Sequence, residues 1–151
     1  MGNVGLWGDI SMENSPMLRL VYVSNARFGL NQNELESIMH LSKLRNKLAG
    51  VTGVLLFNGV NFMQVLEGDR AQTLNLYDRI LKDTRHSGIK TIVQEKIDHL
   101  TYPAWGMKLK RFSEPNRDTD YRKMEEEIAN ALIDITPTDL QRMMKVFLAA
   151  N

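Results

Sequence analysis

The sequence predicts an α+β sandwich: a mixed five-stranded sheet with two helices on one face, followed by a C-terminal extension of two more helices. Three observations predict it. Five short segments alternate apolar and polar residues, and two longer segments show helical spacing. Their order along the chain is βαββαββ. This order extends the ferredoxin-like βαββαβ sandwich by one strand, and it makes the first and third strands neighbours at the sheet centre.

The first strand and the first helix have clear boundaries in the sequence. Residues 18–24 alternate with the period of a strand. Asn31 is the expected N-cap of a helix that runs to about Leu48, and Glu34 is placed as the reciprocal partner of a capping box. Gly50 should end the helix, because glycine accepts the left-handed conformation at a helix C-terminus.

A hairpin, a second helix and two further strands complete the sandwich. The stretches VTGVLLFN and NFMQVLEG predict two strands, and Asn58-Gly59 between them predicts a tight turn in which both residues take positive φ. The second helix is expected over about 69–84. Residues 89–98 and 105–112 again alternate and predict the fourth and fifth strands.

Three regions follow from this pattern. Residues 1–16 are rich in Gly, Asn and Ser and lack the basic and apolar regions of a signal peptide, so a flexible leader is expected. Residues 17–112 form the predicted sandwich. Residues 113–151 form the helical extension, with helices expected over about 119–135 and 138–149. Their apolar stripes must be buried, and we expect them to pack on the sheet face opposite the two sandwich helices.

The composition excludes several classes of function. The chain has 151 residues, 43% of them hydrophobic and 25% charged, and a net charge of +1, which is typical of a globular domain that binds no nucleic acid. The absence of cysteine excludes disulfides, thiolate metal sites and cysteine nucleophiles, and it fits a cytoplasmic protein. No apolar run is long enough to cross a membrane.

Polar side chains stand where the pattern calls for apolar ones. Gln64 lies between Phe62 and Leu66 on the apolar face of a central strand, where an unpaired amide costs about 1–3 kcal/mol. Tyr22 is predicted on the same face of the neighbouring strand. A scaffold gains nothing from this pair, whereas a ligand with polar edges would use both residues.

The two helices add polar groups around the same space. At 100° per residue, one side of the first helix carries Leu35, Ile38, Met39, Ser42, Arg45, Asn46 and Ala49, and a second apolar side carries Leu41, Leu44 and Leu48. In the second helix one stripe is Leu74, Tyr77 and Leu81, and another is Leu76, Arg79 and Asp83. Taken singly, Arg79 and Asp83 fit a surface ion pair, and Arg45 and Asn46 fit a helix end that frays into solvent. Together with Tyr22 and Gln64 they predict a flat slot for a planar heteroaromatic ligand.

Residues 17–112 resemble a BLUF domain, the blue-light sensor that uses flavin. The matching stretches are LVYVS, SKLRNKLAGVTGVLL, NFMQVLEG, YDRILKDTRH and YPAWGMKL. The resemblance implies a noncovalently bound FAD whose isoalloxazine ring lies between the two helices. It also implies that the short chain is a sensor without an attached enzyme domain, and not an enzyme itself.

The predicted slot and the resemblance together predict the site residues. The expected cofactor-binding residues are Tyr22, Ile38, Ser42, Arg45, Asn46, Gln64, Leu76, Arg79, Asp83 and His86, and the expected photoactive residues are Tyr22, Gln64, Trp105 and Met107. By resemblance, Asn46 bonds the flavin C4 carbonyl and N3 edge, Gln64 bridges Tyr22 and the N5/O4 region, and Arg79 and Asp83 contact the pyrimidine side and ribityl chain. Arg45 departs from the Asn or His of many relatives.

The expected activity is a light switch. Tyr22 would give an electron and a proton and recover both, leaving the Gln64 amide rearranged and the absorption red-shifted. We expect the signal to reach an unidentified partner protein or an interface of a homo-oligomer. Two alternatives are a small flavin-dependent oxidoreductase, for which no dinucleotide-binding Gly-rich loop is present, and a cofactor-free ferredoxin-like interaction module.

Overall fold

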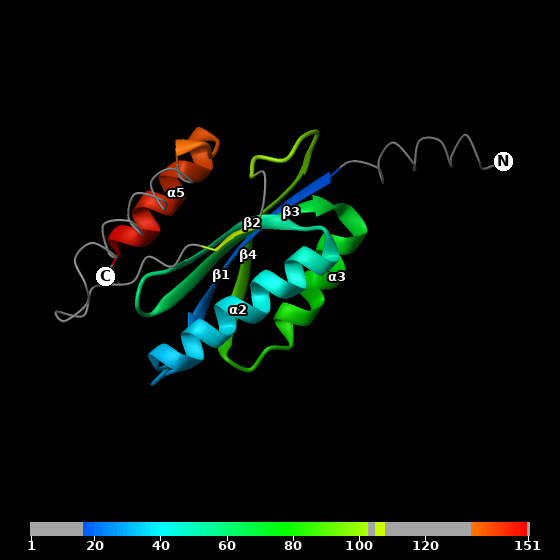
Figure 1. The fold of residues 1–151 in the computed structure, drawn as a ribbon. Helices are drawn as coiled ribbons and strands as arrows, with labels where there is room; N and C mark the ends of the chain where they lie inside the picture. Colours follow the sequence, from blue (N-terminus) through cyan, green and yellow to red (C-terminus); the bar gives the residue numbers. More distant parts are fainter. Residues whose placement is uncertain (1–16, 103–104, 108–133, 151) are drawn as a thin grey trace, which may run out of the picture.

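A computed structural model describes residues 17–102, 105–107 and 134–150 (Figure 1). Its elements are β1 (Met17–Ala26), α2 (Gln32–Ala49), β2 (Thr52–Phe57), β3 (Asn61–Asp69), α3 (Arg70–Leu81), β4 (His86–Ile97), β5 (Trp105–Met107) and α5 (Thr138–Ala149). The expected leader over 1–16 and the expected helix over 119–135, apart from its last two residues, lie outside the described residues. No helix of the described part is long and apolar enough to cross a membrane.

The strands form one sheet in the order β4-β1-β3-β2-β5. β1 and β3 are antiparallel neighbours near the centre, as predicted, and β5 runs parallel to β2 at one edge. Helices α2 and α3 lie side by side on one face of the sheet, and α5 lies on the other (Figure 1). The predicted α+β class is therefore confirmed.

Local signals set the ends of α2. The Asn31 side chain accepts a hydrogen bond from the Glu34 backbone N–H at 2.9 Å, which satisfies one of the free donors of the first turn. The Glu34 carboxylate forms an ion pair with Arg27. At the other end Gly50 adopts φ 68°, the left-handed conformation that favours glycine, and its N–H bonds the Asn46 and Lys47 carbonyls.

The β2–β3 connection differs from the predicted turn. Gly59 has φ 100°, but Asn58 does not take a positive φ. Instead the Asn58 side chain accepts hydrogen bonds from the backbone N–H groups of Val60 and Asn61, at 3.0 and 2.7 Å. Asn58 shapes this hairpin through its side chain, which is the alternative that asparagine offers in turns.

One predicted apolar side of α2 is exposed. Leu44 and Leu48 are 49% and 80% exposed, and Leu81 at the end of α3 is 48% exposed. In α2 the buried apolar residues Leu35 and Ile38 lie on one side, whereas α3 buries Tyr77 from one predicted stripe and Leu76 from the other. The prediction of a second buried side in α2 was therefore wrong.

Alternation along the strands divides the core into two layers. Leu18, Leu20 and Tyr22 of β1 pack with Leu76 and Tyr77 under the helices. On the other face a second cluster joins the sheet to α5; its members are Val21, Val54, Leu56, Met63, Val65, Tyr102, Leu140, Met144 and Leu148. The described part of the C-terminal extension thus packs on the face opposite α2 and α3, as expected.

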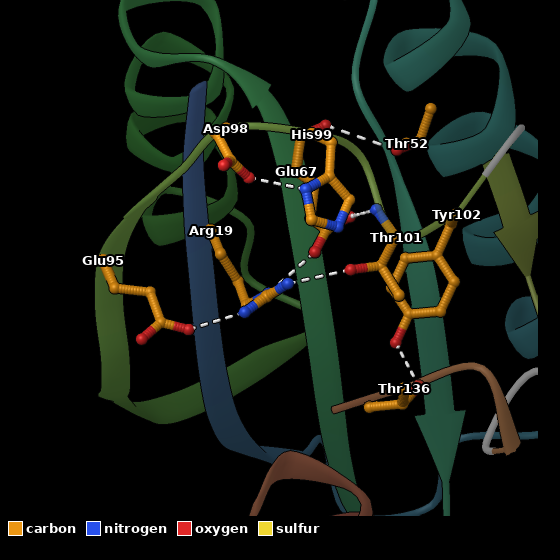
Figure 2. Close-up of polar contacts among 9 residues, drawn as sticks. All are labelled: Arg19, Thr52, Glu67, Glu95, Asp98, His99, Thr101, Tyr102 and Thr136. Carbon is orange, nitrogen blue, oxygen red and sulfur yellow. Dashed lines mark hydrogen bonds and ion pairs between the residues drawn. The ribbon is translucent and has the colours of Figure 1, made fainter. Parts of the chain in front are cut away.

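A buried polar network ties the sheet to the loop after β4 (Figure 2). Arg19 donates to Glu67 at 2.7 Å, to Glu95 at 2.6 Å and to the Thr101 hydroxyl at 2.8 Å. Glu67 is fully buried and also accepts the Thr101 backbone N–H at 2.7 Å. Burial disfavours the charged guanidinium, but its bonds to the two glutamates outweigh that cost and raise the pKa of Arg19.

The network extends to the segment before α5. The Tyr102 hydroxyl lies 2.6 Å from the Thr136 hydroxyl (Figure 2), and burial raises the pKa of Tyr102 to about 12. At the far end of α5, the Asn58 side-chain amide donates to the Phe147 carbonyl at 3.2 Å. α5 is therefore held at both ends as well as along its apolar stripe.

Candidate functional site

A pocket lies where α2, α3 and the central strands meet. The empty space between its walls, counted together with its open mouth, is about 500 Å³. The pocket is lined by Tyr22, Ile38, Ser42, Arg45, Asn46, Leu55, Phe62, Gln64, Leu76, Ile80, Asp83, Arg85 and His86. Nine of the ten predicted cofactor-binding residues are in this set, and Arg79 is the exception.

Tyr22 and Gln64 form the floor of the pocket. They are direct partners in the β1–β3 ladder, and the Tyr22 hydroxyl donates a hydrogen bond to Gln64 Oε1. Both side chains are buried. Burial, followed by the charges of Tyr77 and Asp83, raises the pKa of Tyr22, so the phenol keeps its proton.

Gln64 also lies in one row of residues that crosses the sheet. Gln64 pairs with Leu55 of β2, and Leu55 pairs in turn with Met107 of β5. The β5 backbone therefore lies two strands away from the Tyr22–Gln64 pair. The side chains of Trp105 and Met107 lie outside what the structure describes, so their predicted photoactive roles stay predictions.

Asn46 provides an unpaired hydrogen-bond donor in the wall. The residue is 1% exposed, and its Nδ2 atom has no hydrogen-bond partner within the described part of the chain. Its backbone carbonyl is satisfied by the Val51 N–H at 2.9 Å. A buried amide of this kind costs free energy unless a ligand accepts from it, so the geometry favours a ligand with an acceptor at this edge.

The charged end of the pocket is built from Asp83 and Arg85. Their closest oxygen and nitrogen atoms lie 2.5 Å apart, and the hydrogen bond from Arg85 lowers the pKa of Asp83 to about 2. α3 ends at Leu81, so Asp83 has left the helix and does not face Arg79 at helical spacing. Arg79 lies in an adjoining groove that shares Arg45 and Leu76 with the pocket.

His86 closes the side of the pocket near the end of α3. Its ring lies edge-on to Tyr22 and Phe62, with centroid distances of 6.1 and 6.4 Å. The two ring nitrogens lie 2.8 Å from the Ser24 hydroxyl and 2.9 Å from the Ile80 carbonyl oxygen. The imidazole thus bridges β1 and the C-terminal turn of α3.

Four lining residues were missed in the sequence. Leu55 and Phe62 share the strand face of Gln64, and Ile80 follows Leu76 at helical spacing, so alternation and periodicity could have found all three. Arg85 carries no such signal, because it lies in the irregular segment between α3 and β4. Only the position at which α3 ends brings it to the pocket.

The pocket has the features of a site for a flat heterocycle. Apolar side chains of Ile38, Leu55 and Leu76 line it, a tyrosine–glutamine pair lies on its floor, and an unpaired amide donor lies in its wall. An isoalloxazine ring presents carbonyl and ring-nitrogen acceptors along one edge and apolar faces on either side. The residues present therefore fit a flavin.

Comparison with known proteins agrees with this assignment. Residues 17–108 match the family model described as BLUF, sensors of blue-light using FAD. A photoactivated adenylate cyclase subunit beta of Euglena longa is 34% identical over 91 residues, covering 60% of this chain and 11% of that protein. The blue light- and temperature-regulated antirepressor BluF of Escherichia coli K12 is 33% identical over 90 residues, covering 60% of this chain and 22% of that protein.

A solved structure extends the likeness to the fold. The dark-state structure of the BLUF protein BlrB superposes with a TM-score of 0.64 at 27% identity, covering 91% of this chain and 99% of that one. The fold and the site define a flavin-binding light sensor. The chain belongs to the BLUF family, whose members sense blue light using FAD.

Proposed function

We propose that the pocket holds the isoalloxazine ring of FAD and that the Tyr22–Gln64 hydrogen bond is the element that light rearranges. The observation that carries the proposal is this buried bond on the pocket floor, with the unpaired Asn46 donor in the wall of the same pocket. Bound FAD would supply the light absorption and the one-electron chemistry that the protein lacks.

Tyr22 is the proposed electron and proton donor. Its hydroxyl already donates to Gln64, so a proton can leave the phenol along an existing hydrogen bond when the ring loses an electron. Because burial stabilises the neutral phenol, the electron and proton return to Tyr22 when the charges recombine. The tyrosine ends the cycle unchanged, and no substrate is consumed.

Gln64 is the proposed switch. An amide has a donor end and an acceptor end, so rotation or tautomerisation exchanges the group that faces Tyr22 with the group that faces the flavin edge. In the structure Oε1 accepts the Tyr22 hydrogen bond, and the Nε2 donors remain for other acceptors. A rearranged amide would alter the hydrogen bonding at flavin O4 and shift the absorption to longer wavelength.

Asn46, Ser42, Arg45, Asp83 and His86 are proposed to contact the ring or its ribityl chain, together with the apolar walls Ile38 and Leu76. Arg79 would meet only a part of FAD that extends into the adjoining groove.

The absorption spectrum of the purified, FAD-loaded chain tests the function: a reversible red shift in blue light supports it. Bleaching by NADH would indicate an oxidoreductase, and failure to bind FAD would indicate an interaction module.

The proposed output runs through α5 to a partner protein or to another copy of the chain. β3 carries Gln64 on one face, and its neighbours Met63 and Val65 pack with Met144 of α5 on the other. A displaced Gln64 could therefore loosen α5 from the sheet. Hydrogen exchange of residues 138–149 should be faster in the light. Equal protection in light and dark would contradict this route.

A further inference from the structure

The Ser24–His86–Ile80 bridge is the part of the pocket whose role the proposed photochemistry leaves open. Ser24 lies two residues after Tyr22 on β1, on the same face, and is buried. His86 is the first residue of β4 and lines the pocket. The bridge therefore connects the strand of the proposed electron donor to the wall beside the ring.

The partners of His86 fix its tautomer. A backbone carbonyl only accepts hydrogen bonds, so the 2.9 Å contact with the Ile80 oxygen requires the proton to be on Nε2. The neutral ring then has a lone pair on Nδ1, and the Ser24 hydroxyl, 2.8 Å away, must be the donor to it. Both ring nitrogens are thus used within the protein.

The Ile80 carbonyl gains from the same contact. It belongs to the last turn of α3, where carbonyl oxygens lack a following helical N–H. It accepts from the Asp83 backbone N–H at 3.1 Å and from His86 Nε2, so both of its lone pairs are used. The imidazole therefore also fastens the C-terminal end of α3 to β1.

We propose that Ser24 is a positioning residue that holds the His86 ring in place as a wall of the flavin pocket and keeps it from hydrogen-bonding the cofactor. With both nitrogens engaged, His86 meets the ligand only through its ring carbons, next to Tyr22 and Phe62. This leaves the polar recognition of the ring to groups such as Asn46, whose Nδ2 is unpaired in the described chain. The inference rests on the proposed flavin site.

Loss of the Ser24 hydrogen bond would change the geometry of the pocket wall. A ring that lost its Ser24 donor could turn, and its free Nδ1 could accept a hydrogen bond from another group. The Ser24 hydroxyl therefore shapes the pocket although Ser24 itself is not among the lining residues.

Nitrogen-15 NMR of the full chain tests the proposal without relying on the photocycle. In mildly alkaline buffer, where imidazoles are neutral, we expect His86 to carry its proton on Nε2 and to show a hydrogen-bonded acceptor signal at Nδ1. Ser24→Ala should move the Nδ1 signal to the value of an unbonded nitrogen and weaken FAD binding about two- to tenfold. Ser24→Thr, which keeps the hydroxyl, should restore the Nδ1 signal and the affinity for FAD. Ser87→Ala, a change at an exposed serine, should leave the signal and the affinity unchanged.

A second measurement separates this inference from the proposed function. On addition of FAD, the His86 nitrogens should keep their signals while the Asn46 side-chain nitrogen shifts. A proton on Nδ1 in the wild type, an unmoved Nδ1 signal in Ser24→Ala, or a new hydrogen bond from His86 to FAD would overturn the inference. If FAD does not bind at all, the proposed function fails. The tautomer of His86 in the wild-type protein still tests the role of Ser24 in that case, and it also does so if Ser24→Ala does not fold.

Discussion

Tyr22 and Gln64 face each other across the central strands, and the Tyr22 hydroxyl donates to Gln64 Oε1. Because the two residues are paired in the ladder, the backbone of the sheet fixes their separation. If light acts at this bond, as proposed, we expect the change in the side chains of the pair, and first in the amide of Gln64.

Removing the phenol should abolish the light response. In Tyr22→Phe the ring and its packing remain, so FAD binding should survive, while the fluorescence of the bound flavin becomes longer-lived and no red-shifted state forms. Time-resolved fluorescence and light-minus-dark absorption measure both. Tyr102→Phe, which removes a buried hydroxyl on the opposite face, should leave the photocycle intact. A normal red shift in Tyr22→Phe would identify another electron donor.

Removing the unpaired amide should weaken the cofactor site. Asn46→Ala deletes the buried Nδ2 donor, and the lost hydrogen bond of about 0.5–1.5 kcal/mol should raise the Kd for FAD roughly two- to tenfold. Fluorescence titration measures the change. Asn33→Ala on the exposed first turn of α2 serves as the control. Unchanged affinity and an unchanged dark spectrum in Asn46→Ala would place Asn46 outside the flavin contacts.

The Asp83–Arg85 pair should make stability depend on acid. The hydrogen bond from Arg85 lowers the pKa of Asp83 from 3.8 to about 2 in the folded protein. The pair therefore contributes its full stabilisation above pH 3.8, and this stabilisation is lost as the pH falls through about 2. Asp83→Asn should lower the free energy of unfolding by about 1 kcal/mol, since solvent screens a pair that is not fully buried.

Denaturant unfolding of wild type and Asp83→Asn at several pH values measures this difference. It should be constant in neutral and weakly acidic buffer and should shrink near pH 2, where the wild-type carboxyl takes up its proton. Asp78→Asn on the exposed side of α3 is the control. A difference between Asp83→Asn and wild type that stays the same into strong acid would contradict the role of Arg85.

The buried network behind the sheet should matter for stability and not for light sensing. Arg19→Met leaves the Glu67 carboxylate buried with the Thr101 N–H as its remaining hydrogen-bond donor in the described part of the chain, and should cost about 3–5 kcal/mol. The Arg19→Met/Glu67→Met double variant should recover much of that loss. Denaturant unfolding measures the stability of both variants, with Arg142→Met on the exposed side of α5 as the control. A single variant as stable as the wild type would contradict the account.

Much of the site could be predicted because it lies on regular elements. Strand alternation placed Tyr22 and Gln64 on one face, and helical spacing placed Ile38, Ser42 and Asn46 on the wall of the pocket. The cap at Asn31 and the stop at Gly50 are local, so the residues themselves specify them. These inferences need only the periods of the helix and the strand.

The features that could not be predicted depend on where the helices end and on which of their sides pack against the rest of the chain. α3 ends at Leu81, which separates Asp83 from Arg79 and brings Arg85 to the pocket. Leu44 and Leu48 have the spacing of a buried stripe, but α2 is covered along one side and leaves them exposed. The positive φ predicted for Asn58 was wrong, because Asn58 forms the turn through hydrogen bonds of its side chain.

The most direct test of the central claim is the light-minus-dark absorption spectrum of FAD-bound Gln64→Leu beside that of the wild type. Leucine fills a volume close to that of glutamine but offers no hydrogen bond, so FAD should stay bound. Gln94→Leu on the exposed edge strand β4 is the matched control. We predict a reversible red shift in the wild type and in Gln94→Leu, and none in Gln64→Leu. A normal red shift in Gln64→Leu would contradict the assignment of Gln64 as the switch.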